Sequence, residues 1–215
     1  MGRPKKSEMN PVPTKERILL KALELIAEKG YDAVSVRSIT KALGLNEATL
    51  YIYYRNKADL LDAIFKRLED TLITPGFKVP PVEIFQEMDD FDLAAFLVNG
   101  ARKFFGRADS NTLLTWRILF TNQYRHLSAR RSIEEHIINA PIKFFGEMVE
   151  NIKKAGKIQG DIDAKIAGRI IAAVFLQYSF IANLKVAWDE DDATEFVLLA
   201  NDLKLISDLL NPTTN

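Results

Sequence analysis

The stretch Ser35–Leu61 reads SVRSITKALGLNEATLYIYYRNKADLL, and the rest of the chain is organised around it. Its apolar spacing and capping residues predict one short helix over about Val36–Leu43, a break at Gly44 and a second short helix over about Glu47–Tyr54. Asn56 then begins a third helix. Two helices joined by a tight turn that contains glycine are the layout of a helix-turn-helix.

The second of these helices has an inward and an outward side. Leu50 and Tyr54 are four residues apart, so they share one face and are expected to pack inward. Tyr51 and Tyr53 then project outward, where their hydroxyls can reach phosphates and their rings can meet base methyl groups. The alternative, that these two tyrosines fill the core of a small head, stays open at this point.

Composition limits the classes of function. The chain has 215 residues, no formal net charge and a hydrophobic content of 47%, which is enough for a core in one or two domains. Residues 1–66 hold 12 Lys and Arg against 8 Asp and Glu, whereas the remainder holds 17 against 21. A basic head on an acidic body indicates an anionic partner at one end only. The absence of cysteine excludes disulfides, cysteine-ligated metals and thiol catalysis.

The chain is expected to divide at its prolines and glycines. Residues 1–13 form a polar, basic arm, either an idle tail or an arm that enters an A·T-rich minor groove. Residues 14–55 form the head, with Thr14 as the expected N-cap of its first helix, and residues 56–73 form a connecting helix. The run Thr74-Pro75-Gly76 ends that helix, and residues 74–215 form a larger helical body. No segment alternates with a period of two, so the predicted fold class is all-α.

Five helical segments are expected in the body. They run from Asp90 or Asp92 to Gly106, from Ser110 or Asn111 to Tyr124, over Ser128–Ala155 with a kink or break at Pro141, over Asp163–Trp188, and over about Thr194–Leu210. The segment Ile166–Ile181 is apolar almost all round, which indicates either a dimer interface or the central helix of a monomer. Its longest unbroken apolar run is Ile170–Leu176, far below the roughly 20 residues that span a bilayer. We therefore expect a soluble, cytoplasmic protein with no membrane segment.

Catalytic and metal-binding patterns are missing from the sequence. His126 and His136 are not at the spacing that places two ligands on one helix face, and Glu134-Glu135 is more typical of a solvated face. No glycine-rich phosphate loop or nucleophile motif occurs. We expect no enzyme, no cofactor and no metal site.

The head resembles that of the TetR family of bacterial transcriptional regulators over about residues 14–65. The resemblance is carried by Glu28-Lys29-Gly30-Tyr31, Ser35-Val36-Arg37-Ser38-Ile39, Ala42-Leu43-Gly44-Leu45, Thr49-Leu50-Tyr51-Ile52-Tyr53-Tyr54 and Asn56-Lys57-Ala58-Asp59-Leu60-Leu61. It implies a ligand-responsive repressor whose residues 74–215 bind an effector and dimerise. The homodimer would form through about residues 163–210, and each head would read half of a palindromic operator.

The resemblance also implies which residues contact DNA: Arg37, Ala48, Thr49, Tyr51, Tyr53 and Lys57. Glu47 departs from the family pattern, and its carboxylate either accepts a hydrogen bond from a cytosine amine or merely favours the N-terminus of its helix. Lys57 is a cation in the first turn of a helix, where the dipole disfavours it, so a phosphate contact is a reason for its presence.

The effector is expected to be small and apolar or aromatic, because the body is rich in aromatic residues. A pocket is expected between the Trp116–Tyr124 helix and the Phe175–Tyr178 face, with Trp116, Phe120, Tyr124, Phe175 and Tyr178 as its lining. Arg102, Arg117, Gln177 or Asn183 are candidates to orient a polar end. By spacing alone, the same aromatics are more often ordinary core than the lining of a cavity. The alternative function is a helical protein–protein interaction module without sequence-specific DNA binding.

Overall fold

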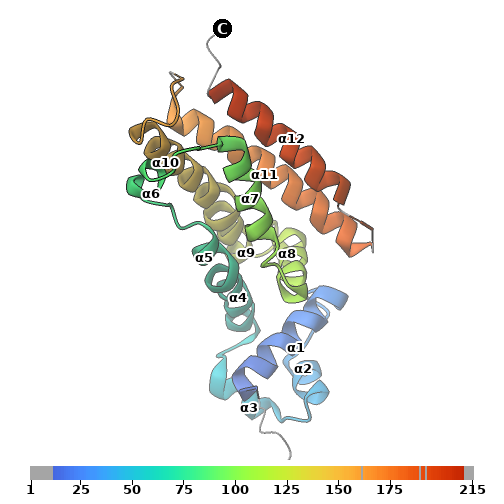
Figure 1. The fold of residues 1–215 in the computed structure, drawn as a ribbon. Coiled ribbons are helices and arrows are strands. Elements are labelled where there is room, and N and C mark those ends of the chain that lie inside the picture. The colour runs from blue at the N-terminus through green and yellow to red at the C-terminus, as the bar shows by residue number, and fades with distance from the viewer. Residues whose placement is uncertain (1–11, 161, 189, 192, 211–215) are drawn as a thin grey trace, which may run out of the picture. The chain divides into compact units, whose positions relative to one another are not determined.

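A computed structural model of the chain describes residues 12–160, 162–188, 190–191 and 193–210 (Figure 1). The described residues contain helices and no strand, which confirms the all-α prediction. Internal contacts divide the chain into two units, Met1–Ile64 and Phe65–Asn215. The expected basic arm, residues 1–13, lies almost wholly outside the described residues.

The first unit contains α1 (Thr14–Lys29), α2 (Val36–Ala42), α3 (Glu47–Tyr53) and the beginning of α4 (Lys57–Leu68). Its core is one apolar cluster whose members come from all four helices and the α1–α2 turn: Ile18, Leu19, Ala22, Leu23, Ile26, Tyr31, Val34, Ile39, Leu50, Tyr54, Leu60, Leu61 and Ile64. The prediction that Thr14 caps α1 is wrong. Pro13 occupies the N-cap position with extended backbone, makes no side-chain cap, and its carbonyl accepts from Arg17 N–H at 3.0 Å.

The second unit begins with the rest of α4, the π-helical segment η1 (Glu69–Ile73) and the short α5 (Thr74–Gly76). The helices α6 (Val82–Gln86), α7 (Leu93–Phe105) and α8 (Ser110–Asn122) follow. The sequence offered Ser110 or Asn111 as the cap of α8, but the cap is Asp109, whose carboxylate accepts from Thr112 N–H at 2.8 Å. Carboxylates are favoured there because they also interact with the positive end of the helix dipole.

The helical path through Pro141 is interrupted rather than simply bent. It consists of α9 (Leu127–Ser132), the π-helical segment η2 (Ile133–Asn139) and α10 (Ala140–Lys154). Pro141 lies in the first turn of α10. Proline lacks an N–H and clashes with the carbonyl of the preceding turn, and a wider π-helical turn is one way to relieve that clash.

The last two helices are α11 (Ala164–Ala187) and α12 (Ala193–Leu210), which lie side by side in Figure 1. α11 packs against α10, α8 and α12, and its Gly168 lies directly on the backbone of Gly146 in α10. By length and composition alone, Ala164–Val186 could cross a membrane. Its packing against three neighbouring helices accounts for the apolar residues on its buried faces, such as Ile171 and Phe175, but Ile166, Ile170, Phe180 and Leu184 remain exposed.

Candidate nucleic-acid interface and effector cavity

Local hydrogen bonds fix the turn between α2 and α3. Ser35 Oγ accepts from Ser38 N–H, and Ser38 Oγ accepts from Ser35 N–H, both at 3.0 Å, which forms a reciprocal cap for α2. Asn46 Oδ1 accepts from Thr49 N–H at 2.8 Å and caps α3. Gly44 has φ of 67°, a left-handed conformation that other residues adopt at a cost. Serine and asparagine favour N-cap positions and glycine favours positive φ, so residue type accounts for the caps at Ser35 and Asn46 and for Gly44, whereas the return bond to Ser38 Oγ was not predicted.

α3 packs against the rest of the head on one side only. Leu50 and Tyr54 are buried, as predicted, and the Tyr54 hydroxyl donates to the Lys15 carbonyl at 3.2 Å. Burial, followed by the nearby charges of Glu16 and Asp59, raises the pKa of Tyr54 to about 12. The phenol is therefore neutral in the folded head at ordinary pH, and it anchors the C-terminal end of α3 to α1.

The opposite side of α3 faces solvent. Tyr51 is 50% exposed and Tyr53 is also exposed, which confirms their predicted outward direction. Glu47 and Ala48 are exposed as well, whereas Thr49 is half-buried and its hydroxyl donates to Asn46 Oδ1 at 2.8 Å. This face carries hydroxyls, a carboxylate and small apolar groups, which are the groups that read base edges and phosphates.

The sequence interpretation missed Ile52. It is 75% exposed and points away from the core, between Ala48 and Thr49 on the helix circumference. A large apolar side chain that is mostly exposed on a short polar face is a candidate contact for thymine methyl groups. The sequence could have predicted the exposure of Ile52, because this residue lies two positions after the buried Leu50 and so cannot lie on the same face of the helix.

Arg37 and Lys57, the two predicted basic contacts, have different surroundings. Arg37 is exposed on α2. The Lys57 ammonium donates to the carbonyls of Tyr31 and Val34, each at 2.9 Å, and lies 4.0 Å from the centre of the Tyr31 ring. Lys57 therefore ties the start of α4 to the α1–α2 turn, a structural use that sequence reasoning did not foresee.

The start of α4 carries a further local network. Asn56 Oδ1 accepts from Asp59 N–H at 2.8 Å, and the Asp59 carboxylate accepts from the backbone and the guanidinium of Arg55. These hydrogen bonds from Arg55 hold the pKa of Asp59 below its usual range. Because this ion pair is exposed to solvent, it contributes little to the stability of the head, and its main effect is to orient the Arg55 side chain.

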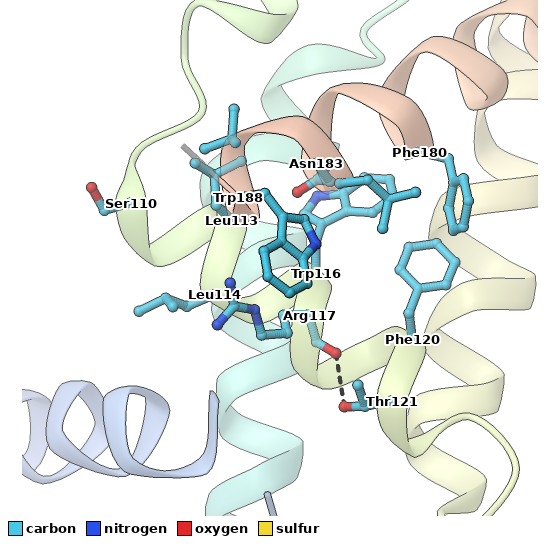
Figure 2. Close-up of a pocket in the computed structure, with 12 residues that line it drawn as sticks. Ser110, Leu113, Leu114, Trp116, Arg117, Phe120, Thr121, Phe180, Asn183 and Trp188 are labelled. Carbon is cyan, nitrogen blue, oxygen red and sulfur yellow. Dashed lines mark hydrogen bonds between the residues drawn. The ribbon is translucent and has the colours of Figure 1, made fainter. Parts of the chain in front are cut away.

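The body contains a cavity of about 640 Å³ between α8 and the C-terminal half of α11 (Figure 2). Trp116 and Phe120, two of the predicted lining residues, line it together with Arg117 and Asn183, two of the predicted polar residues. Figure 2 shows the rings of Phe120 and Phe180 facing each other across the two helices, with centres 5.5 Å apart in an edge-on arrangement.

The other predicted lining residues lie elsewhere. Phe175 borders a void of about 20 Å³, and Tyr178 borders an inner chamber of about 170 Å³. The prediction that Tyr124 lines the pocket is wrong. Tyr124 is 93% exposed and is not among the lining residues, because α8 ends at Asn122 and the chain turns away after it. Of the remaining polar candidates, Arg102 lies over the Phe196 ring at 5.3 Å and Gln177 is exposed.

Within the described part of the chain, no group of three or more His, Cys, Asp or Glu residues is arranged to hold a metal ion. Glu134 accepts from Arg130 Nε at 2.8 Å, and His136 Nε2 lies 3.6 Å from Glu69 Oε2. These are ordinary side-chain pairs on helix surfaces.

Comparison with known proteins adds a family match to this geometry. Residues 18–64 match the profile of "Bacterial regulatory proteins, tetR family". The fatty acid metabolism regulator protein of Bacillus subtilis (strain 168) is 41% identical over 54 residues, which are 25% of this chain and 28% of that protein. The match therefore spans less than a third of that relative's length.

Two solved structures resemble the whole chain. Salmonella enterica GusR superposes with a TM-score of 0.65 at 21% identity, over 95% of this chain and 99% of that one. FadR from Bacillus subtilis in complex with stearoyl-CoA superposes with a TM-score of 0.62 at 21% identity, over 91% and 99%. At such identities the likeness shows a shared fold.

Proposed function

We propose that this chain is a member of the tetR family of bacterial regulatory proteins and a ligand-responsive transcriptional repressor that binds a palindromic operator as a homodimer. The observation that carries the proposal is the two-sided α3. Leu50 and Tyr54 hold it to the head, whereas Glu47, Ala48, Tyr51 and Ile52 stand free on the other side. A short helix presented in this way is suited to the major groove.

Contacts to DNA divide by chemistry. Arg37 and Tyr53 have groups that donate to phosphate oxygens, so they set the position of the head. Thr49 joins them only when its hydroxyl turns from Asn46 Oδ1 to a phosphate. Tyr51 and Ile52 offer ring edges and methyl groups to bases, and Glu47 offers an acceptor to a cytosine amine. We therefore assign affinity chiefly to the first set and sequence preference to the second.

The homodimer is supported by an apolar stripe on α11. Residues spaced four and three apart along the helix share one exposed face: Ile166, Ile170, Ala173, Gln177, Phe180 and Leu184. α12 adds the exposed Leu198, Leu205 and Leu209. Burying each large apolar side chain contributes about 1.5–3 kcal/mol, and two copies of a helix pair form a four-helix bundle. Such a symmetric partner matches the two half-sites of a palindrome.

The effector is assigned to the cavity between α8 and α11. Its volume of about 640 Å³ lies within the roughly 300–1,000 Å³ of small-molecule sites. Phe180 and Leu184 belong both to the stripe and to the cavity lining, so a second chain would border the cavity mouth. The FadR neighbour holds stearoyl-CoA, which shows that this fold can contain a ligand.

The experiment is selection of bound duplexes from a random library with the full chain, followed by affinity measurement at several salt concentrations. We expect an inverted repeat and an affinity that falls steeply with salt. Tyr51→Ala should weaken binding about tenfold or more, and Tyr124→Ala, which alters an exposed tyrosine in the body, should leave affinity unchanged. Sedimentation should show the same dimer for both variants.

Two results would count against the proposal. Recovery of no common sequence would favour a protein–protein interaction module instead. Operator affinity that is unchanged in the Tyr51→Ala variant would show that α3 is not the reading helix.

A further inference from the structure

One side chain, Trp116, separates three cavities in the body. It lines the groove of about 640 Å³ between α8 and α11, the inner chamber of about 170 Å³ and the void of about 20 Å³. Trp116 is 6% exposed and its ring is stacked on Phe120, with centres 5.5 Å apart. The groove and the inner chamber also share Leu113, Asn183 and Val186. The two spaces therefore share part of their wall, and the Trp116 indole belongs to this shared wall.

The groove has one cationic group. The Arg117 guanidinium belongs to its lining, is exposed, and has no carboxylate partner among the residues that the structure describes. The Thr121 hydroxyl already donates to the Arg117 carbonyl at 2.8 Å, as the dashed line in Figure 2 marks. Asn183 Nδ2 donates to the Ser179 carbonyl at 2.8 Å, which leaves its amide oxygen as an acceptor. Ser110, Asn183 and Trp188 are neutral donors in the same lining, and Arg117 is the charged donor among these residues. Its forked donor set suits a carboxylate.

Most of the side chains that line the inner chamber are apolar, among them Phe104 and Phe105. Tyr178 and Asn183 add a phenol and an amide, and the two small hydroxyl groups of the lining donate to acceptors within the protein. Thr112 Oγ1 donates to Asp109 Oδ1 and Ser179 Oγ donates to the Phe175 carbonyl, both at 2.7 Å. At about 170 Å³ the chamber is smaller than the roughly 300 Å³ of a complete small-molecule site, so it can hold part of a ligand.

We propose that the effector is an amphipathic acid: its carboxylate meets Arg117 in the groove, and its apolar chain passes a displaced Trp116 into the inner chamber. This inference rests on the proposed effector-binding role of the body. It follows from the order of the two compartments, because a cationic entrance that leads to an apolar chamber selects molecules with one anionic end and one apolar end. Trp116 then determines how long a chain the site accepts.

The test is calorimetric titration of the full-length protein with straight-chain alkanoic acids of increasing length and with the matched alcohols. Each methylene that enters the chamber should tighten binding up to about fourfold, until the space is filled. The acids should bind at least about tenfold more tightly than the alcohols. Arg117→Gln should abolish that difference, and Arg131→Gln, which alters an exposed arginine on α9, should preserve it.

Trp116 is tested by two variants of different severity. In Trp116→Ala, the acid that binds most tightly should have a longer chain than in the parent, and in Trp116→Phe this shift should be smaller. The phenylalanine variant provides the test if the alanine variant does not fold. Equal affinity for acids and alcohols, an acid preference that survives Arg117→Gln, or an optimum unmoved in both tryptophan variants would overturn the inference. Operator affinity of the unliganded protein, measured on the same preparations, separates the proposed repressor function from the proposed class of effector. If the protein binds its operator but binds no acid, the effector class is rejected and the repressor function stands.

Discussion

Lys57 offers the sharpest test of how the head is held together. Its ammonium makes two hydrogen bonds of 2.9 Å to carbonyls of the α1–α2 turn and lies over the Tyr31 ring. Lys57→Met retains the apolar stem and removes the charge. A hydrogen bond from a charged group contributes about 1.5–3 kcal/mol and an exposed cation–π contact about 0.5–1 kcal/mol. The low ends of these ranges, for two hydrogen bonds and one cation–π contact, come to about 3.5 kcal/mol. Lys57 is half-buried, so solvent screening reduces this value, and we expect a loss of about 2–3 kcal/mol in the stability of the head.

The head must be observed by itself, because both tryptophans lie in the body. Amide hydrogen exchange of α1, α2 and α3 under native conditions reports the opening free energy of this unit. Lys41→Met, which alters an exposed lysine on α2, is the matched control and should change exchange little. If the opening free energy of the head in the Lys57→Met variant lies within about 0.5 kcal/mol of the parent value, Lys57 has no structural role.

Salt dependence of operator binding distinguishes the two roles of Lys57. A lysine that contacts one phosphate contributes about 0.9 to the slope of log affinity against log salt. A loss of head stability with an unchanged slope identifies a purely structural residue. A reduced slope without loss of stability supports the phosphate contact that the sequence predicts.

Two further predictions concern packing and pH. A Cβ at Gly168 would lie 2.4 Å from Gly146 N, so Gly168→Ala should destabilise the body by about 1–3 kcal/mol in urea unfolding. Gly146→Ala, whose nearest new contact is 3.7 Å, should be nearly neutral, and Gly100→Ala, which has open space, should stabilise by about 0.4–1 kcal/mol. The pKa of Tyr54 is raised from 10.0 to about 12, so its contribution to stability is complete below pH 10 and is lost as pH rises toward 12. Tyr54→Phe should reduce the loss of head structure at alkaline pH. In an ultraviolet titration, the variant should lack the tyrosine that ionises at the highest pH, and a titration identical to the parent's would contradict the assignment of that step to Tyr54.

The head could be predicted closely because short-range rules decide it. Caps at Ser35 and Asn46, the positive φ of Gly44 and the inward pair Leu50 and Tyr54 each depend on neighbours within a few residues. Lys57 was interpreted less completely, because its partners lie 23 and 26 residues away in the sequence. A dipole argument considers only the helix on which the residue stands, and it cannot reveal carbonyls of a distant turn.

The body was predictable in its number of long helices and less so in the faces they present. Aromatic spacing placed a pocket between α8 and α11, yet the lining residues on α11 begin at Phe180, beyond the predicted Phe175 and Tyr178. The reason is the crossing of α10 and α11 at Gly146 and Gly168, where close backbone contact draws the first half of α11 into the core. The α11 residues that line the cavity, Phe180, Asn183, Leu184 and Val186, all lie in the second half of this helix. The crossing at the two glycines fixes the first half against α10, so a larger residue at Gly168 should alter the cavity as well as the stability of the body.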